Sequence, residues 1–208
     1  NHRNIIVSDQ AGKSNILSRL EKYGIKIDSK DPKILKILEE VKDREFSGYS
    51  YDGADASFEL LANRLLGNVP DYLKVESYSV TVEKLDKLKT NAEVVFLIDG
   101  KKIKCNGKGN GPVNALDNAI RENFSKVEKY YNFFSDLKLL DYKVRILNTG
   151  TEAITRVLIE STDKSGVSWF TIGVSPNIIE ASFKALIDSL DYKLFKEKAP
   201  ANTKLNEK

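Results

Sequence analysis

One order of predicted elements occurs twice in this sequence, at a constant offset of 66 residues. The matched pairs are Gly107 and Gly173, Val113 and Ile179, Ala115 and Ala181, Ala119 and Ala185, and Ile120 and Leu186. Several matches at one offset, on matching predicted elements, indicate a duplicated supersecondary unit. A chance alignment of two similar helices is the alternative. The repeat predicts an α+β fold with two pseudo-symmetric βββα units.

The two units are predicted at about residues 70–134 and 135–195. Strands are expected at 72–82, 92–99 and 101–106, because these stretches are rich in β-branched and aromatic residues. Asp99-Gly100 predicts a tight hairpin between the second and third strands, and a helix follows at 112–127. The second unit reads as strands at 137–148, 152–162 and 167–174 and a helix from Pro176 to about Leu190. The two related helix starts are Gly111-Pro112 and Ser175-Pro176.

Residues 1–69 predict a small helical subdomain before the repeat. An apolar run at 3–7 and a loop at 8–13 precede helices at about 14–23, 32–46 and 55–66. Asp31 is the expected cap of the second helix, and Gly24 and Gly67 are stop residues. The buried stripe of the second helix is predicted from Ile34, Leu38 and Val41, with Leu35 alongside. Residues 67–71 are the expected domain boundary, and residues 196–208 predict a disordered tail.

Composition excludes several classes of protein. Charged residues make up 30% of the 208 residues, and the net charge of +3 has no basic block, which disfavours nucleic-acid binding. No stretch approaches the ~18 apolar residues of a membrane span, and no segment reads as a signal peptide. A single cysteine, Cys105, excludes an internal disulfide and suits the cytoplasm. We expect Cys105 to be a packing residue on a strand.

Two scarce residue types limit the chemistry. The sequence holds no methionine and starts at Asn1, which leads us to expect a piece of a longer protein. It holds one histidine, His2, and one cysteine. A zinc site or a Cys/His or Ser/His/Asp triad is therefore not expected within these residues, and we predict neither a catalytic nor a metal site here.

The segment from Gly107 to Ala115 is the main candidate for binding. Glycines at alternate positions end a predicted strand, and Pro112 opens a helix. Glycine lets backbone approach a ligand closely, and proline suits the first helical turn. Free N–H groups at the positive end of a helix suit a carboxylate or phosphate. A plain tight strand-to-helix connection is the alternative.

Three other patterns are weaker. Gly12-Lys13-Ser14 resembles the end of a phosphate-binding loop, but Val7 stands where that motif needs glycine. Gly107-Lys108-Gly109 fails as a dinucleotide fingerprint, because Pro112 stands where that motif needs glycine or alanine. The aromatic cluster of Tyr130, Tyr131, Phe133 and Phe134 lacks interleaved arginines, so a core or a subunit contact is favoured over base stacking.

Several short motifs resemble the carboxy-terminal part of the citramalate synthase and 2-isopropylmalate synthase family. They are residues 8–15, the segment Gly53-Ala54-Asp55-Ala56-Ser57-Phe58-Glu59-Leu60-Leu61, the element Gly109-Asn110-Gly111-Pro112-Val113, and residues 155–160 and 169–175. Residues 53–61, 155–160 and 169–175 resemble the citramalate branch. The resemblance implies a LeuA-type regulatory domain of paired βββα units that forms homodimers and binds the end-product amino acid of the pathway.

The resemblance also implies an effector pocket. Its lining would be Gly109, Gly111, Val113 and Asn114 on the first unit, with Leu139, Tyr142, Ile146 and Ala153 from the next two strands. Backbone N–H groups would hold the carboxylate, Asn114 the ammonium, and Leu139 with Ile146 a branched tail. Asn114 departs from the aspartate common in the family. Leu139 and Ile146 as ordinary core residues are the alternative.

The parent enzyme implied by the resemblance condenses acetyl-CoA with a 2-oxo acid in a barrel that binds a divalent metal. That barrel is absent from these residues, so we expect this chain alone to be inactive and to hold no cofactor. The first expectation is a (R)-citramalate synthase that uses pyruvate and is inhibited by isoleucine. The alternatives are a leucine-inhibited 2-isopropylmalate synthase using 2-oxoisovalerate, a stand-alone amino-acid-binding module, and a nucleotide-dependent enzyme that uses Gly12-Lys13-Ser14.

Overall fold

The computed structural model describes residues 2–149 and 152–203. In chain order its elements are α1 (His2–Lys22), α2 (Lys33–Phe46), α3 (Asp55–Leu65), β1 (Lys74–Lys84), β2 (Leu88–Ile98), β3 (Lys101–Gly109), α4 (Pro112–Asn123), a 3₁₀ turn (Phe124–Lys126), α5 (Glu128–Phe134), β4 (Lys138–Thr149), β5 (Glu152–Thr162), β6 (Ser168–Ser175) and α6 (Ile178–Lys196). The order βββα occurs twice, as the repeat predicts. The α+β prediction is confirmed.

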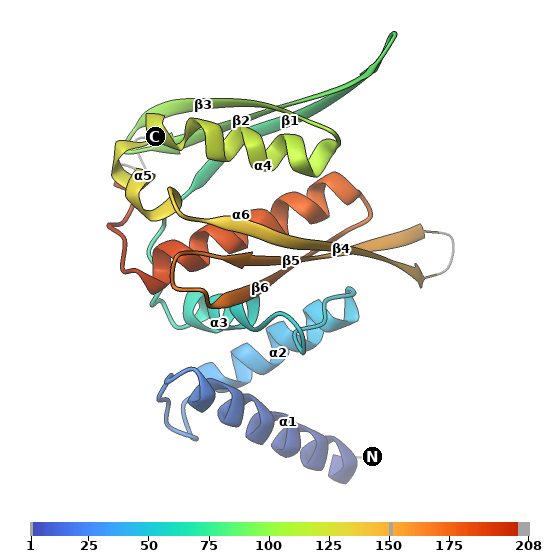
Figure 1. The fold of residues 1–208 in the computed structure, drawn as a ribbon. Coiled ribbons are helices and arrows are strands. Elements are labelled where there is room, and N and C mark those ends of the chain that lie inside the picture. The colour runs from blue at the N-terminus through green and yellow to red at the C-terminus, as the bar shows by residue number, and fades with distance from the viewer. Residues whose placement is uncertain (1, 150–151, 204–208) are drawn as a thin grey trace.

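The two units form three layers. Strands β1–β2–β3 make one antiparallel sheet and β4–β5–β6 make the other, and α4 and α6 lie between the two sheets (Figure 1). One hydrophobic core spans both units, from Val94 and Phe96 on β2 to Val157 and Ile159 on β5. The rings of Tyr78 and Phe183 stack at a centroid distance of 4.1 Å, which joins β1 to α6.

The repeated glycines sit where each third strand touches its helix. A Cβ added at Gly107 would overlap the backbone nitrogen of Ala119. A Cβ at Gly173 would overlap the carbonyl oxygen of Ala181. Glycine is therefore required at both positions so that strand and helix backbones can meet. The equivalence at an offset of 66 residues is a real structural repeat.

The predicted hairpin between β2 and β3 is confirmed. Asp99 and Gly100 form its two-residue loop with φ of 51° and 78°, and Ile98 pairs with Lys101 across it. Two successive positive φ values are those of a type I′ turn, whose twist matches that of the flanking strands.

The outer faces of the two sheets differ. The outer face of β1–β3 carries ion pairs between Lys102 and Glu76 (2.8 Å) and between Lys104 and Glu93 (2.6 Å). Beneath the other sheet, Ile172 and Val174 belong to a second core shared with α1, α2 and α3. The first outer face is polar, whereas the second is covered by the helical part of the chain.

Polar contacts join α3 to the second unit. The Ser57 hydroxyl donates to Asp188 on α6 (2.8 Å) and accepts from the backbone N–H of Ile172 on β6 (3.0 Å). Arg64 on α3 bonds Asp188 and Asp191, each at 2.8 Å. The helical part is thus anchored to the second unit, while the boundary at residue 69 stays a prediction.

The start of the chain differs from expectation. The predicted loop at 8–13 and helix start near residue 14 are wrong, because α1 begins at His2 and continues through the apolar run and these residues. Gly12 lies inside this helix, with the side chain of Leu38 on α2 close to it. In the second helix Asp31 does accept from the N–H of Lys33, as expected of a cap (2.9 Å). Ile34, Leu38 and Val41 are buried, which confirms the predicted stripe, whereas Leu35 is exposed and Ile37 is buried in addition.

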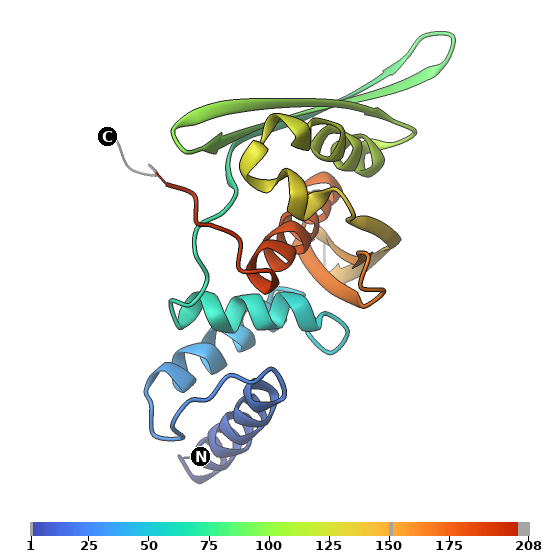
Figure 2. The same cartoon turned by 60° about the vertical axis from the view of Figure 1, so that its left-hand side comes forward.

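The end of the chain is also more ordered than predicted. Helix α6 extends to Lys196, and residues 197–203 cross the connection between α3 and β1 (Figure 2). Buried Asn202 bonds the N–H of Asp99 (2.8 Å) and the carbonyl of Leu97 (2.9 Å) at the β2–β3 hairpin. The prediction of a disordered tail is wrong for these residues, and 204–208 lie outside the described residues.

The remaining unpredicted element is α5, in which Tyr130 and Phe134 are buried core residues and Tyr131 is exposed. Cys105 is fully buried, as expected of a packing residue, and burial raises the pKa of its thiol to about 11. Within residues 2–149 and 152–203, no helix is both long enough and apolar enough to cross a membrane.

Candidate functional site

The start of α4 leaves backbone donors open. Gly111 is its N-cap residue in extended conformation, and Pro112 opens the helix. The first intrahelical bond runs from the N–H of Ala115 to the carbonyl of Gly111 (2.9 Å). No side chain caps this helix, so the N–H groups of Val113 and Asn114 have no partner within the described part of the chain. Unpaired N–H groups at a helix start favour an anion.

The start of α6 is closed by its own side chains. Asn177 is the N-cap, and its Oδ1 accepts from the N–H groups of Ile179 (2.8 Å) and Glu180 (3.2 Å). Ser175 donates to the carboxylate of Glu180 and accepts from the N–H of Asn177 (3.1 Å). These bonds satisfy the donors that a helix start leaves open.

The two starts occupy the same place in the repeat. At the offset of 66, Gly109, Gly111 and Asn114 correspond to Ser175, Asn177 and Glu180. The bond from Ala115 to Gly111 likewise corresponds to the bond from Ala181 to Asn177 (2.9 Å). The first unit therefore has glycine at the positions where the second has capping side chains. The sequence holds this signal, since asparagine is a favoured N-cap, but the sequence reasoning paired Pro112 with Pro176 and missed it.

Local geometry explains two of the predicted residues. A Cβ at Gly109 would overlap the backbone nitrogen of Ala115, so the end of β3 passes very close to α4. The Oδ1 of Asn114 accepts from the N–H of Asn110 (3.2 Å), and the rest of this exposed side chain remains open to solvent. A Cβ at Gly111 would meet no heavy atom within 4 Å, so space lies beside the helix start.

The other predicted lining residues lie on β4 and β5 and have mixed surroundings. Leu139 and Tyr142 pack partly buried against the main core, and the Tyr142 hydroxyl is bonded to Ser182 on α6 (2.9 Å). Burial raises the pKa of Tyr142. Ile146 is 65% exposed, and Ala153 is exposed on β5. Leu139 and Tyr142 thus have structural partners already, whereas Ile146 presents apolar surface to solvent.

The first group lies toward the same end of the molecule as the far end of β4, which carries Ile146, whereas Leu139 lies near the opposite end of β4. The starts of α4 and α6 and the far end of β4 all point to the right in Figure 1. No hydrogen bond joins the two groups in the described residues. The assignment of all eight residues to one pocket therefore stays a prediction.

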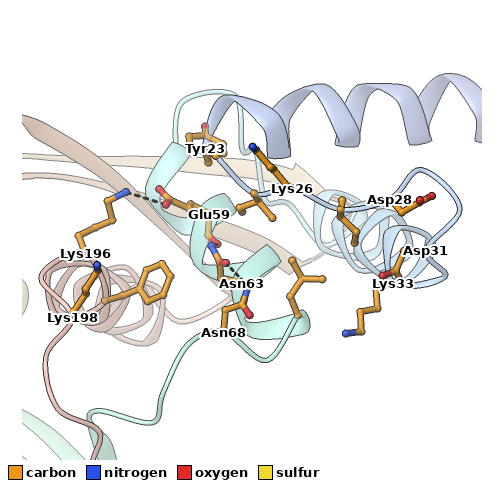
Figure 3. A pocket seen from close by; sticks show the side chains of 15 residues that line it. Tyr23, Lys26, Asp28, Asp31, Lys33, Glu59, Asn63, Asn68, Lys196 and Lys198 are labelled. Atoms are coloured by element: carbon orange, nitrogen blue, oxygen red, sulfur yellow. Dashed lines mark hydrogen bonds and ion pairs between the residues drawn. The ribbon is translucent and has the colours of Figure 1, made fainter.

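A separate cleft lies away from the start of α4, between the α1–α2 connection, α3 and the end of α6 (Figure 3). It encloses about 640 Å³. Its deepest acid, Glu59, is buried and accepts from Tyr192 (3.0 Å) and Lys196 (3.1 Å). The labelled rim is mainly charged, with Asp28, Asp31 and Lys33 on one side and Lys198 on the other (Figure 3). Ile25, Ile27, Leu66 and Phe195 also line the cleft, so its lining mixes charged and apolar side chains.

The structure also argues against a phosphate-binding loop at Gly12-Lys13-Ser14. Gly12, Lys13 and Ser14 lie in the middle of α1. Their backbone groups are therefore part of a continuous helix and cannot wrap a phosphate. A nucleotide-dependent enzyme built on these residues is not supported.

Comparison with known proteins agrees with this architecture. Residues 52–194 match the LeuA allosteric (dimerisation) domain. The chain is 47% identical over 201 residues to a (R)-citramalate synthase of Geobacter sulfurreducens, covering 94% of this chain and 37% of that protein. It is 45% identical over 202 residues to a (R)-citramalate synthase of Aquifex aeolicus, covering 95% and 38%.

A more distant relative is a 2-isopropylmalate synthase of Paraburkholderia phymatum, 28% identical over 189 residues, covering 90% of this chain and 34% of that protein. The chain thus spans little more than a third of the length of these relatives. Because the family model covers most of the chain, including both βββα units and α3, the chain belongs to the LeuA allosteric (dimerisation) domain family.

Proposed function

We propose that this chain is the regulatory, dimerising C-terminal portion of a (R)-citramalate synthase-type acyltransferase, and that it binds a branched-chain amino acid, with isoleucine as first choice. The observation that carries the proposal is the open start of α4, where the equivalent helix of the second unit is closed by Asn177. One helix start of the repeat is thereby kept available for a ligand carboxylate.

The chemistry of the proposed site follows from its groups. The N–H groups of Val113 and Asn114 would hold the carboxylate, and the Oδ1 of Asn114, which has a second lone pair besides the one that accepts from Asn110, would accept from the ammonium. Ile146 supplies apolar surface for the aliphatic tail. Since Ile146 is largely exposed in one chain, we place the complete pocket where two copies of the chain meet. A homodimer would then bury the effector.

The proposed parent enzyme joins acetyl-CoA to pyruvate in a barrel outside these residues, with a divalent metal. Effector binding would shift the regulatory domain, and α3 would pass the shift on through Ser57 and Arg64. Such coupling is typically worth ~1–3 kcal/mol and is reciprocal for binding. The chain by itself is expected to condense no acetyl-CoA.

Calorimetry of the chain with isoleucine, leucine and valine tests this proposal. We expect isoleucine to bind, and Gly111→Asn to abolish binding by copying the Asn177 cap onto α4. Asn177→Gly is the matched control, because it opens the other helix start and should leave affinity unchanged. Unaltered isoleucine binding by Gly111→Asn would refute the placement.

The second candidate is the same portion of a 2-isopropylmalate synthase, which would use 2-oxoisovalerate and respond to leucine. The higher identity to proteins named (R)-citramalate synthase favours the first candidate. Tighter binding of leucine than of isoleucine would reverse this preference. A stand-alone amino-acid-binding module would be supported if the upstream gene sequence encoded no barrel.

A further inference from the structure

A groove on the outer side of the second sheet gathers three positively charged side chains. It lies between β4 and the α2–α3 connection and encloses about 390 Å³. Lys143, Arg145 and Arg156 line it, and Leu158 and Ile172 supply apolar surface. The residues come from three adjacent strands, so the groove is built on a rigid part of the fold.

Two of these cations oppose each other directly. Arg145 on β4 and Arg156 on β5 are cross-strand partners in the antiparallel register. Like charges directly opposite on neighbouring strands destabilise a sheet. Burial, followed by the charge of Arg145, lowers the pKa of Arg156. The fold therefore keeps a repulsive pair that packing alone does not explain.

The carboxylates near these two arginines pair with other cations and do not balance the charge of Arg145 and Arg156. Lys143 pairs with Asp141 (3.2 Å). Asp52, on the α2–α3 connection, is almost fully exposed and lies 3.9 Å from Arg19. Arg156 donates to the carbonyl of Gly48 (2.6 Å). In the described part of the chain, Arg145 has no carboxylate partner.

We propose that this groove binds a small organic anion, whose carboxylate or phosphate lies between Arg145 and Arg156 and whose short apolar part covers Leu158. Guanidinium groups match both oxyanions in geometry and charge. The anion would relieve the repulsion between the two arginines. This site lies on the opposite face of the second sheet from α6 and is independent of the effector proposal.

The test is a nuclear magnetic resonance titration of the chain at low ionic strength, since salt screens exposed charges. The probes are inorganic phosphate, butyl phosphate and butanoate. We expect shifts of the Arg156 Nε–H and of the amides of Arg145 and Gly53. Butyl phosphate should bind more tightly than phosphate, and comparison with butanoate identifies the preferred head group.

Variants decide whether the groove is the site. Arg145→Gln should weaken binding by about tenfold or more, as loss of a charge-assisted bond predicts. Lys138→Gln is the matched control, because Lys138 is an exposed cation on the same strand outside the groove. Equal affinity in Arg145→Gln, shifts spread over surface lysines in both variants, or no shift with any probe would overturn the proposal.

Discussion

The N-termini of α4 and α6 occupy equivalent positions in the repeat, but within the described residues only that of α6 is capped by a side chain. Both follow a strand whose glycine, Gly107 or Gly173, lies against the helix backbone. At α6 the side chain of Asn177 fills the space beside the first N–H groups. At α4 the corresponding Gly111 leaves that space empty. Comparing the two units therefore distinguishes the glycine contact, which the fold requires, from the uncapped helix start, which a ligand would require.

The required part is the strand-to-helix contact, because neither unit could pack with a larger residue there. The variable part is the cap, because a helix tolerates glycine or asparagine at the N-cap with only a few tenths of a kcal/mol between them. Exchanging glycine and asparagine at the N-cap therefore opens or closes an anion site with only a small change in stability. Comparing matched substitutions in the two units tests this distinction.

The largest expected effect comes from the shared contact. Gly173→Ala and Gly107→Ala should each destabilise the chain by about 3 kcal/mol, since the added methyl overlaps helix backbone that cannot move freely. Urea denaturation measures the loss. Gly53→Ala is the control, because a Cβ there meets no heavy atom within 4 Å. Equal stability of Gly107→Ala and Gly53→Ala would break the claimed equivalence of the units.

The next effect concerns the attachment of α3 to the second unit only. Arg64→Ala removes two charge-assisted bonds, to Asp188 and Asp191. We expect a loss of about 2 kcal/mol in urea denaturation. Lys102→Ala is a control on the exposed face of the first sheet, where an ion pair with Glu76 should contribute well under 1 kcal/mol. Similar losses in both variants would contradict the asymmetry of the outer faces.

The same attachment should give stability a pH dependence. Burial raises the pKa of Asp191 to about 7, against the opposing effect of Arg64. The folded state then holds this proton more tightly than the unfolded state, so stability falls as pH rises from about 4 to about 7. Asp191→Asn should flatten this part of the profile.

Asp163 provides the contrast. Burial would raise its pKa, but bonds from Lys193 and Ser165 outweigh burial and lower it to about 2. The contribution of Asp163 to stability is therefore lost only below about pH 4.

If the stability of Asp191→Asn followed the wild-type profile between pH 4 and 7, the titration assigned to Asp191 would be wrong.

The smallest effect separates the two caps. Asn177→Ala should cost about 1 kcal/mol, because the N–H groups of Ile179 and Glu180 lose their acceptor. Gly111→Ala should cost a few tenths of a kcal/mol less, because no side-chain bond is lost at α4, although glycine is also preferred to alanine at an N-cap. Thermal melting of both variants checks this difference. Equal losses would mean that α4 is capped in some other way.

Much of the fold could be predicted from the sequence because local chemistry and the repeat agree. Asp99-Gly100 specifies its turn by itself, and the two helices of the repeat, α4 and α6, carry clear apolar stripes. The N-terminal half of α1 was missed because Gly12 disfavours helix locally, and its contact with Leu38 on α2 cannot be seen in the sequence. The tail was misread because its lysines obscured the buried residues Ala199 and Asn202, and the partners of Asn202 lie about a hundred residues earlier.

The candidate site was only partly within reach of the sequence. Glycines followed by proline indicated an open helix start, which the geometry of α4 bears out. The partner of Tyr142 on α6, Ser182, lies 40 residues later in the chain, and the burial of Leu139 depends on the assembled core. The contacts of α3 through Ser57 and Arg64 are likewise long-range, so no local pattern could reveal them.

The most direct test is a nuclear magnetic resonance titration of the chain with isoleucine, following the four matched amides. We predict that the N–H signals of Val113 and Asn114 shift on saturation, because they would bind the carboxylate, while those of Ile179 and Glu180 stay in place. Shifts at Ile179 and Glu180 alone, or no shift at either helix start, would contradict the account.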